Sequence, residues 1–228
     1  MVARRVIDAK GRNQRMKAGK LPADVWRDLA RHEGCPEVGA QAVQDELMRA
    51  YTEPHRHYHT IEHVALLLAL MDEHGHAVVD RAAVALAILF HDVVYDPARH
   101  DNEQASADFA SQRLASLGFP DQLVAKVKRY ILATRHGDSA PTTDDADFAL
   151  LLDLDLSVLA ATPAEYDAYA QAIRREYAHI PDKLYRLGRG RILEGFLARD
   201  QIYRTEQLHV LWDERARVNI AGEIAGLA

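Results

Sequence analysis

The sequence predicts an all-α fold built as a single helical bundle, and three observations support this. Apolar residues recur at helical spacing: Val43, Leu47 and Ala50 step by four and three and so share one helical face. The longer apolar runs are rich in Ala and Leu, which are strong helix formers. No segment alternates polar with β-branched apolar residues, and no Asn-Gly hairpin dipeptide occurs. We expect one domain over residues 21–228.

The helices can be predicted in chain order from their apolar runs and their start signals. Residues 60–73 and 80–90 are expected to be buried core helices. Pro120 and Pro181 each stand where a proline opens a helix. Residues 137–143 form a polar stretch with Gly, Ser and Pro, which predicts a loop between two helices.

A further helix start lies at Thr162, which is followed by Pro163 and Glu165. This order provides a capping residue, a proline in the first turn and an acid three positions after the cap. We therefore expect a helix to begin at Pro163.

The charge distribution bears on partners and location. The net charge is −6, yet residues 1–20 hold seven of the 28 basic residues and one of the 34 acidic ones. The acidic remainder argues against nucleic-acid binding, which depends on neutralising phosphates. Residues 1–20 are expected to be a basic, poorly ordered extension. No secretory signal or membrane-spanning stretch is recognisable, so we expect a cytoplasmic protein with no membrane partner. The oligomeric state stays open.

Twelve histidines and a single cysteine, Cys35, constrain any metal site. One cysteine excludes a disulfide scaffold and a cysteine-based zinc site. A metal in this protein would be bound through nitrogen and oxygen.

Four histidines lie in the segment YTEPHRHYHTIEH, residues 51–63. His59 and His63 are four residues apart, so on a helix their rings would project from one face and could share a metal or a substrate. A solvated surface patch is the alternative interpretation, with equal weight from this segment alone.

Two further polar groups interrupt apolar segments. His91 and Asp92 end the helix predicted at 80–90, where they are costly to desolvate unless paired or bound to a cation. Asp153 and Asp155 interrupt LLDLDLSVL, and a divalent cation would relieve the repulsion between two buried carboxylates. For the His91–Asp92 doublet, the structural alternative is a capped helix end. For the two aspartates, it is that one of them caps the following helix, with Asp153 the better candidate.

These residues together resemble the HD superfamily of metal-dependent phosphohydrolases. The pattern is a histidine, a His-Asp doublet and a distant aspartate on separate helices of a bundle, matched here by His63, His91, Asp92 and Asp155. The segments YHTIEH, FHDVVYD and DLDLSVL are similar to those of a small bacterial group of predicted HD phosphohydrolases. The resemblance spans about residues 40–205 and implies an HD-domain helical bundle with these four residues as metal ligands.

This chain also departs from the pattern of the HD superfamily at two points. Many HD proteins follow the doublet with an apolar residue and glycine, where this chain has Val93 and Val94. Dinuclear members add histidines before the last aspartate, and here that interval offers only His100 and His136. We therefore expect one divalent ion. Two imidazoles and two carboxylates suit Mn²⁺, Fe²⁺, Co²⁺, Ni²⁺ or Zn²⁺, and Mg²⁺ stays open.

The expected reaction is hydrolysis of a phosphate ester of a nucleotide or related small molecule by a metal-activated water. Charge on the phosphoryl oxygens requires cationic partners, for which Arg56, His59 and His136 are the candidates. Asp96 is a candidate to orient the water, and a loop-stabilising role before Pro97 has equal weight.

Outside the motif, Arg174 and Tyr177 are candidate contacts for a phosphate or a base, on a face shared with Tyr166, Tyr169 and Ile173. Core packing is the commoner use of such a face. Four polar residues after the doublet are expected either to support the histidines or to cap the next helix: Asp101, Asn102, Glu103 and Ser106.

Two other functions remain open. The first is a helical nucleotide-sensing or regulatory module with a non-catalytic metal site. The second is an oxygenase with two irons, which requires further ligands around His59 and His136.

Overall fold

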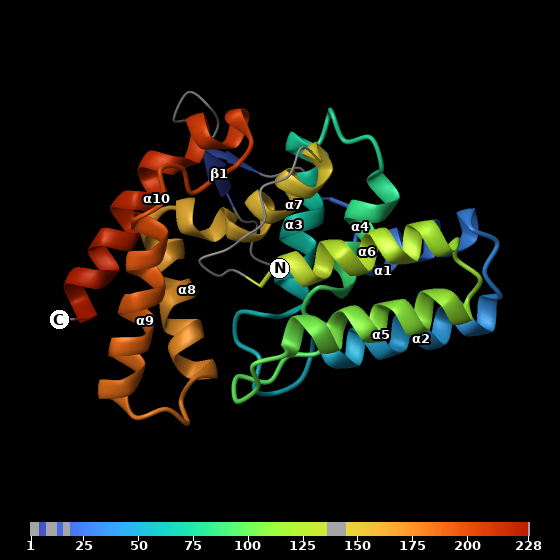
Figure 1. Ribbon diagram of the computed structural model, residues 1–228, viewed down its shortest axis with the longest axis horizontal. Helices are drawn as coiled ribbons and strands as arrows, with labels where there is room; N and C mark the ends of the chain where they lie inside the picture. The colour runs from blue at the N-terminus through green and yellow to red at the C-terminus, as the bar shows by residue number, and fades with distance from the viewer. Residues whose placement is uncertain (1–4, 8–12, 16–18, 136–144, 228) are drawn as a thin grey trace. The chain divides into compact units, whose positions relative to one another are not determined.

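The computed structural model describes residues 5–7, 13–15, 19–135 and 145–227. These residues form ten α-helices, one short 3-10 helix and one pair of three-residue strands (Figure 1). The predicted all-α fold class is confirmed. No helix within the described ranges is both long and apolar enough to cross a bilayer. The loop predicted at residues 137–143 lies outside the described residues.

The chain divides into two compact units, which are described separately. One unit is Ala18–Leu151, and the other combines Leu152–Ala228 with Met1–Lys17. We call them the 18–151 unit and the 152–228 unit. Helix α7 (Ala146–Asp155) contributes residues to both.

The 18–151 unit is organised around α4. Its complete helices are α1 (Pro22–His32), α2 (Glu37–Ala50), α3 (Ile61–His74), α4 (Arg81–Phe90), α5 (Asn102–Ser116) and α6 (Asp121–Ala133). Every residue from Ala83 to Phe90 is buried, because α4 contacts α1, α3, α5 and α6 (Figure 1). A helix that is apolar at every position after Arg81 is stable only in such surroundings.

The ends of α3 and α4 agree with the sequence. The predicted helices 60–73 and 80–90 are found as Ile61–His74 and Arg81–Phe90. Asp80 caps α4 by accepting a hydrogen bond of 3.0 Å from the Ala83 amide. The face predicted on α2 is also confirmed, since Val43 and Leu47 are buried.

Helices α5 and α6 lie side by side and are joined by a tight turn (Figure 1). Gly118 follows α5 with φ +84°, a conformation that glycine adopts without a Cβ clash. The Phe119 amide then donates to the Leu114 carbonyl at 3.1 Å and closes the helix end. Pro120 stands directly before α6, and Pro181 stands directly before α9, as predicted.

The 152–228 unit is built around its last helix. Its elements are the end of α7, the 3-10 helix η1 (Leu156–Ala160), α8 (Pro163–Glu176), α9 (Asp182–Leu197), α10 (Glu206–Leu227), β1 (Arg5–Ile7) and β2 (Asn13–Arg15). Helix α10 packs against η1, α9 and α8. The predicted capping box opens α8, with the Thr162 hydroxyl and the Glu165 carboxylate each accepting from the other residue's amide.

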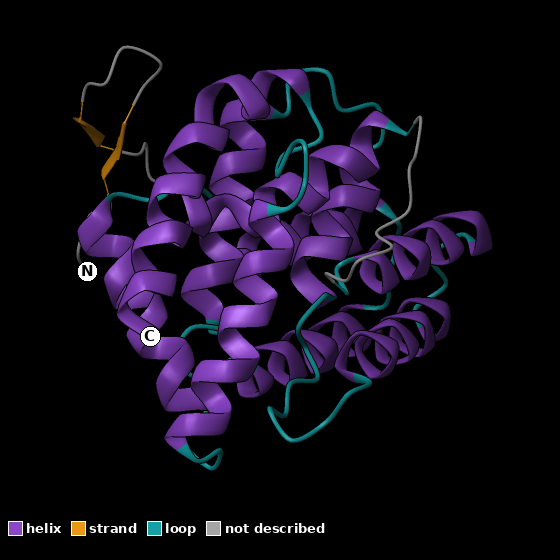
Figure 2. Ribbon diagram, turned by 60° about the vertical axis from the view of Figure 1, so that its left-hand side comes forward, coloured by secondary structure: helices purple, strands orange, loops and turns teal. Residues whose placement is uncertain are grey.

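The N-terminal segment contains two strands that the sequence did not predict. β1 and β2 form an antiparallel pair with Arg5 opposite Arg15 (Figure 2). That residues 1–20 form a poorly ordered extension stays a prediction. Residues 1–4, 8–12 and 16–18 lie outside the described residues. A ladder of three residues per strand relies on backbone hydrogen bonds, so no apolar alternation marked it in the sequence.

Candidate metal centre

Three predicted ligands come together at the junction of α3 and α4. His63 lies in the first turn of α3, and His91 directly follows the last residue of α4. The two histidines are 3% and 1% exposed, and the Asp92 side chain is 17% exposed. The apolar residues that surround both helices exclude water from the imidazoles and leave only the carboxylate partly accessible.

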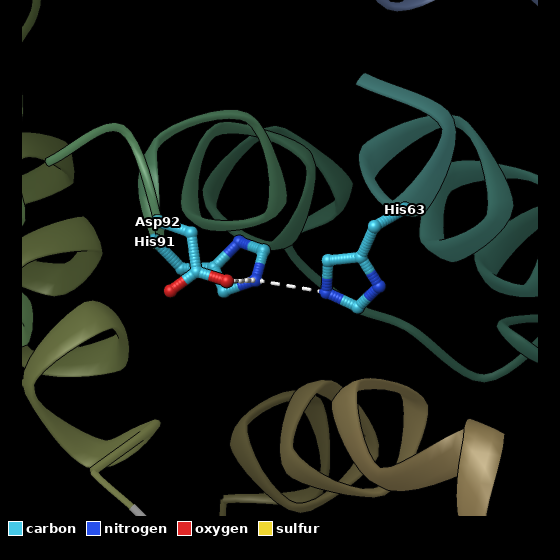
Figure 3. A group of neighbouring side chains, drawn as sticks. All are labelled: His63, His91 and Asp92. Atoms are coloured by element: carbon cyan, nitrogen blue, oxygen red, sulfur yellow. Dashed lines mark hydrogen bonds and ion pairs between the residues drawn. The ribbon is translucent and has the colours of Figure 1, made fainter. Parts of the chain in front are cut away.

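The ligand atoms converge on one point (Figure 3). The Nε2 atoms of His63 and His91 are 3.3 Å apart, and His91 Nε2 lies 3.0 Å from Asp92 Oδ2. All three ligand atoms lie within 4.8 Å of one another. Ligand atoms held about 2.1 Å from a shared ion would be roughly 3.0–3.4 Å apart. The His63–His91–Asp92 group can therefore hold a metal ion.

The orientation of His91 adds a chemical reason for a cation. Its Nδ1 atom lies 2.9 Å from the Ile88 carbonyl, which can only accept, so Nδ1 carries the hydrogen. In the neutral ring, Nε2 is then an acceptor that faces the Asp92 carboxylate. Two acceptors at 3.0 Å repel each other unless a cation or a proton lies between them. A backbone carbonyl that orients a histidine in this way is the usual support of a metal-bound imidazole.

The end of α4 is held by hydrogen bonds to its last carbonyl groups, which a helix leaves without intrahelical partners. The Ile88 carbonyl accepts from His91, and the Leu89 carbonyl accepts from the Tyr51 hydroxyl at 3.1 Å. The Phe90 carbonyl accepts from the Val93 amide. Tyr51 was not identified from the sequence, because nothing there links it to a carbonyl 38 residues later.

Arg56 has a different role from the predicted one. Its side chain is fully buried and donates to the carbonyls of His59, Asp92 and Val93. The prediction of a substrate contact is corrected, because the guanidinium has no exposed surface to offer. The buried carbonyls after α4 need donors, and Arg56 supplies them.

His59 lies beside the group but does not belong to it. Helix α3 begins at Ile61, so His59 precedes the helix and does not share a helical face with His63 as predicted. Its ring lies 6.2 Å from the His63 ring and stacks on Tyr95 at 4.1 Å between centroids. His59 is half-buried.

Asp96 and its neighbours shape the loop after the doublet. Asp96 is exposed, and its carboxylate accepts a hydrogen bond from the Ala98 amide. This contact favours the loop-stabilising role, which was the alternative to orienting the water. The Asn102 side chain bonds both the amide and the carbonyl of Asp96. The Ser106 hydroxyl does the same for Val94. These two residues support the loop backbone, and Asp101 pairs with Arg99.

Of the two aspartates in α7, Asp153 has a structural role. It is completely buried and accepts hydrogen bonds of 2.7 Å from the Arg204 amide and from the amide and hydroxyl of Thr205. Burial raises the pKa of Asp153 above its ordinary value, although these hydrogen bonds oppose the rise. Asp153 therefore holds the start of α10. The sequence predicted instead that it caps the helix that directly follows it.

Asp155 is the last residue of α7 and is half-buried. It belongs to the 152–228 unit, while the other three predicted ligands belong to the 18–151 unit. Its role as fourth ligand stays a prediction. The predicted role of His136 falls on a residue outside the described part of the chain.

Arg174 and Tyr177 lie in the 152–228 unit. Arg174 donates to the carbonyls of Tyr177 and Ile180, and its guanidinium stands 4.6 Å from the Tyr185 ring centroid. It lines an open groove of about 560 Å³ formed by α8, α9 and α10. On the predicted face, Tyr166 and Ile173 are buried, which favours the core-packing interpretation for both.

Comparison with known proteins adds no relative. No protein-family model, no curated protein and no solved structure matches the chain.

Proposed function

We propose that this protein is a cytoplasmic, metal-dependent phosphohydrolase acting on a phosphate ester of a nucleotide or a related small molecule. The convergence of His63, His91 and Asp92 on one point carries the proposal. The resemblance to HD phosphohydrolases, which relies on these three residues and Asp155, supports the same reaction.

The donor set fits a transition-metal ion. Two imidazole nitrogens and one carboxylate oxygen suit Mn²⁺, Fe²⁺, Co²⁺, Ni²⁺ or Zn²⁺ better than Ca²⁺. The resemblance adds Asp155 as the candidate fourth ligand. When bound, such an ion supplies Lewis acidity, which activates water and neutralises charge on phosphoryl oxygens.

The protein residues have separate tasks in this reaction. His63 and His91 bind the ion through Nε2, and the Ile88 carbonyl keeps the His91 ring in the required tautomer. Asp92 supplies negative charge and has the most exposed side chain of the three. His59, stacked on Tyr95 next to His63, is the candidate to stabilise negative charge on the phosphoryl oxygens.

One observation favours the second candidate, a binding or regulatory module with a non-catalytic metal. Both histidines are almost fully buried, as in closed structural metal sites. A catalytic ion must keep an open position, whereas a structural ion has none.

One experiment separates the two. The purified protein is analysed for bound metals, stripped with a chelator, and reloaded with each divalent ion in turn. Each form is then assayed against a panel of nucleotides and phosphate monoesters. Metal-dependent release of phosphate supports the hydrolase. Stoichiometric metal without turnover supports the binding module, and failure to bind any divalent ion overturns both.

A further inference from the structure

The guanidinium of Arg56 joins the loop before α3 to the end of α4. Nη1 donates to the His59 carbonyl at 3.1 Å and to the Asp92 carbonyl at 2.6 Å, and Nη2 donates to the Val93 carbonyl at 3.0 Å. Nε donates to the Glu53 carboxylate at 3.0 Å. One buried side chain therefore fixes the backbone of the ligand Asp92 and of its neighbour His59.

The chemistry of this contact requires arginine. The planar guanidinium presents five N–H donors in a fixed fork, whereas lysine offers three donors on one atom. The carbonyls of Asp92, Val93 and His59 come from two segments more than 30 residues apart in sequence. A single ammonium group cannot reach all of them together with Glu53.

The surroundings show that the guanidinium is built into the fold. Its carbon lies 5.2 Å from the Tyr51 ring centroid and 5.5 Å from the Tyr95 ring centroid. Tyr51 also bonds the Leu89 carbonyl of α4, and Tyr95 stacks on His59. The same aromatic residues that enclose Arg56 thus contact the two segments that it joins.

We propose that Arg56 is a positioning residue of the metal centre: its fork holds the Asp92 backbone so that the carboxylate stays at His91 Nε2 in the geometry that binds the ion. This inference rests on the proposed metal site and makes no claim about the substrate. Supporting residues of this kind typically change metal affinity by about 10- to 100-fold.

The chain offers a close match for a control. Arg217 donates to the carbonyls of Leu197, Arg199 and Asp200, and its Nε donates to Asp213. Like Arg56, it bonds three carbonyls and one carboxylate. Unlike Arg56, it bonds no predicted ligand. The Arg217 side chain is 31% exposed and that of Arg56 is fully buried, so Arg217→Lys removes the same kinds of hydrogen bond at a lower cost in stability and has no effect on the His63–His91–Asp92 group.

The test measures Co²⁺ binding by apoprotein, using titration calorimetry and the visible absorption spectrum of the bound ion. We expect Arg56→Lys to weaken Co²⁺ binding at least 10-fold and to change the spectrum. Arg217→Lys should lower the unfolding temperature and leave the Co²⁺ affinity and the spectrum unchanged. Unchanged Co²⁺ binding in folded Arg56→Lys overturns the inference, as does equal weakening in both variants.

If Arg56→Lys does not fold, a second variant tests the same inference. Glu53→Ala removes the half-exposed carboxylate that orients Nε and leaves the buried carbonyls untouched. It should weaken Co²⁺ binding by a smaller factor, and wild-type affinity in this variant overturns the inference. Absence of Co²⁺ binding in the wild-type protein overturns the metal site itself. Normal Co²⁺ binding in the wild-type protein and in the variants overturns only the role of Arg56.

Discussion

His63 and His91 place their Nε2 atoms 3.3 Å apart although 28 positions separate them in the chain. His63 lies in the first turn of α3 and His91 directly follows α4, and these two helices are in contact. The contact between the helices therefore brings the imidazoles together, and Asp92 completes the group from the position after His91.

Asp92→Ala should abolish metal binding, because it removes the only carboxylate of the three-residue group. Metal content after reloading should fall below about one tenth of the wild-type value, and turnover on a phosphate ester by roughly 100-fold or more. Asp101→Ala is the control, since Asp101 is an exposed acid of the following loop. Retained metal and turnover in Asp92→Ala would contradict the site.

His59→Ala should keep the metal and slow turnover. The ring lies beside His63 without joining the ligand group, so its loss removes a cationic partner of the phosphoryl oxygens, an effect of roughly 100-fold or more. Metal content and the rate of phosphate release are measured together, with exposed His57→Ala as the control. Metal loss would instead make His59 a ligand, and an unchanged rate would remove its proposed role.

Asp153 and Asp155 should respond oppositely to substitution. Asp153→Ala leaves the Arg204 and Thr205 donors without their acceptor and should lower the free energy of unfolding by roughly 2–4 kcal/mol. Asp155→Ala should weaken metal binding and change stability little. Urea unfolding and metal titration of both variants test this, and wild-type metal affinity in Asp155→Ala would remove it from the ligand set.

Asp213 should make the stability of the protein depend on pH in acid. Burial alone would raise its pKa, but hydrogen bonds from Arg217 and the Ile202 amide lower the pKa of Asp213 below its ordinary value. The unfolded chain then binds a proton more readily than the native state. The resulting stabilisation is complete above the unfolded pKa, near 3.9, and is lost as pH falls through the lower folded pKa.

Asp213→Asn should therefore be less stable than wild type at pH 7, by about 1–3 kcal/mol. The difference should shrink as the pH falls below the unfolded pKa near 3.9, because Asp213 of the unfolded chain then binds a proton before Asp213 of the native state does. Urea unfolding between pH 3 and pH 7 measures both curves, with Asp45→Asn on the exposed face of α2 as the control. Parallel curves for wild type and Asp213→Asn would show that Asp213 does not contribute to the pH dependence.

Much of the fold follows from short stretches of sequence. The apolar runs at residues 60–73 and 80–90, the cap at Thr162 and the prolines before α6 and α9 identify helices within a residue or two. Their information is local, because a helix depends on residues three and four positions apart and on its first turn. The pair β1–β2 had no such local pattern and was not predicted.

In the candidate site, too, the residue types could be predicted from the sequence, but their contacts could not. His63, His91 and Asp92 were recognised as ligand types within apolar helices, which requires no knowledge of contacts. The roles of Arg56 and Asp153 depended on their partners, carbonyls of Asp92 and Val93 for one and amides of Arg204 and Thr205 for the other. Residue type and spacing identify which groups are costly to bury, but only the packing of distant segments decides which partner each buried group meets.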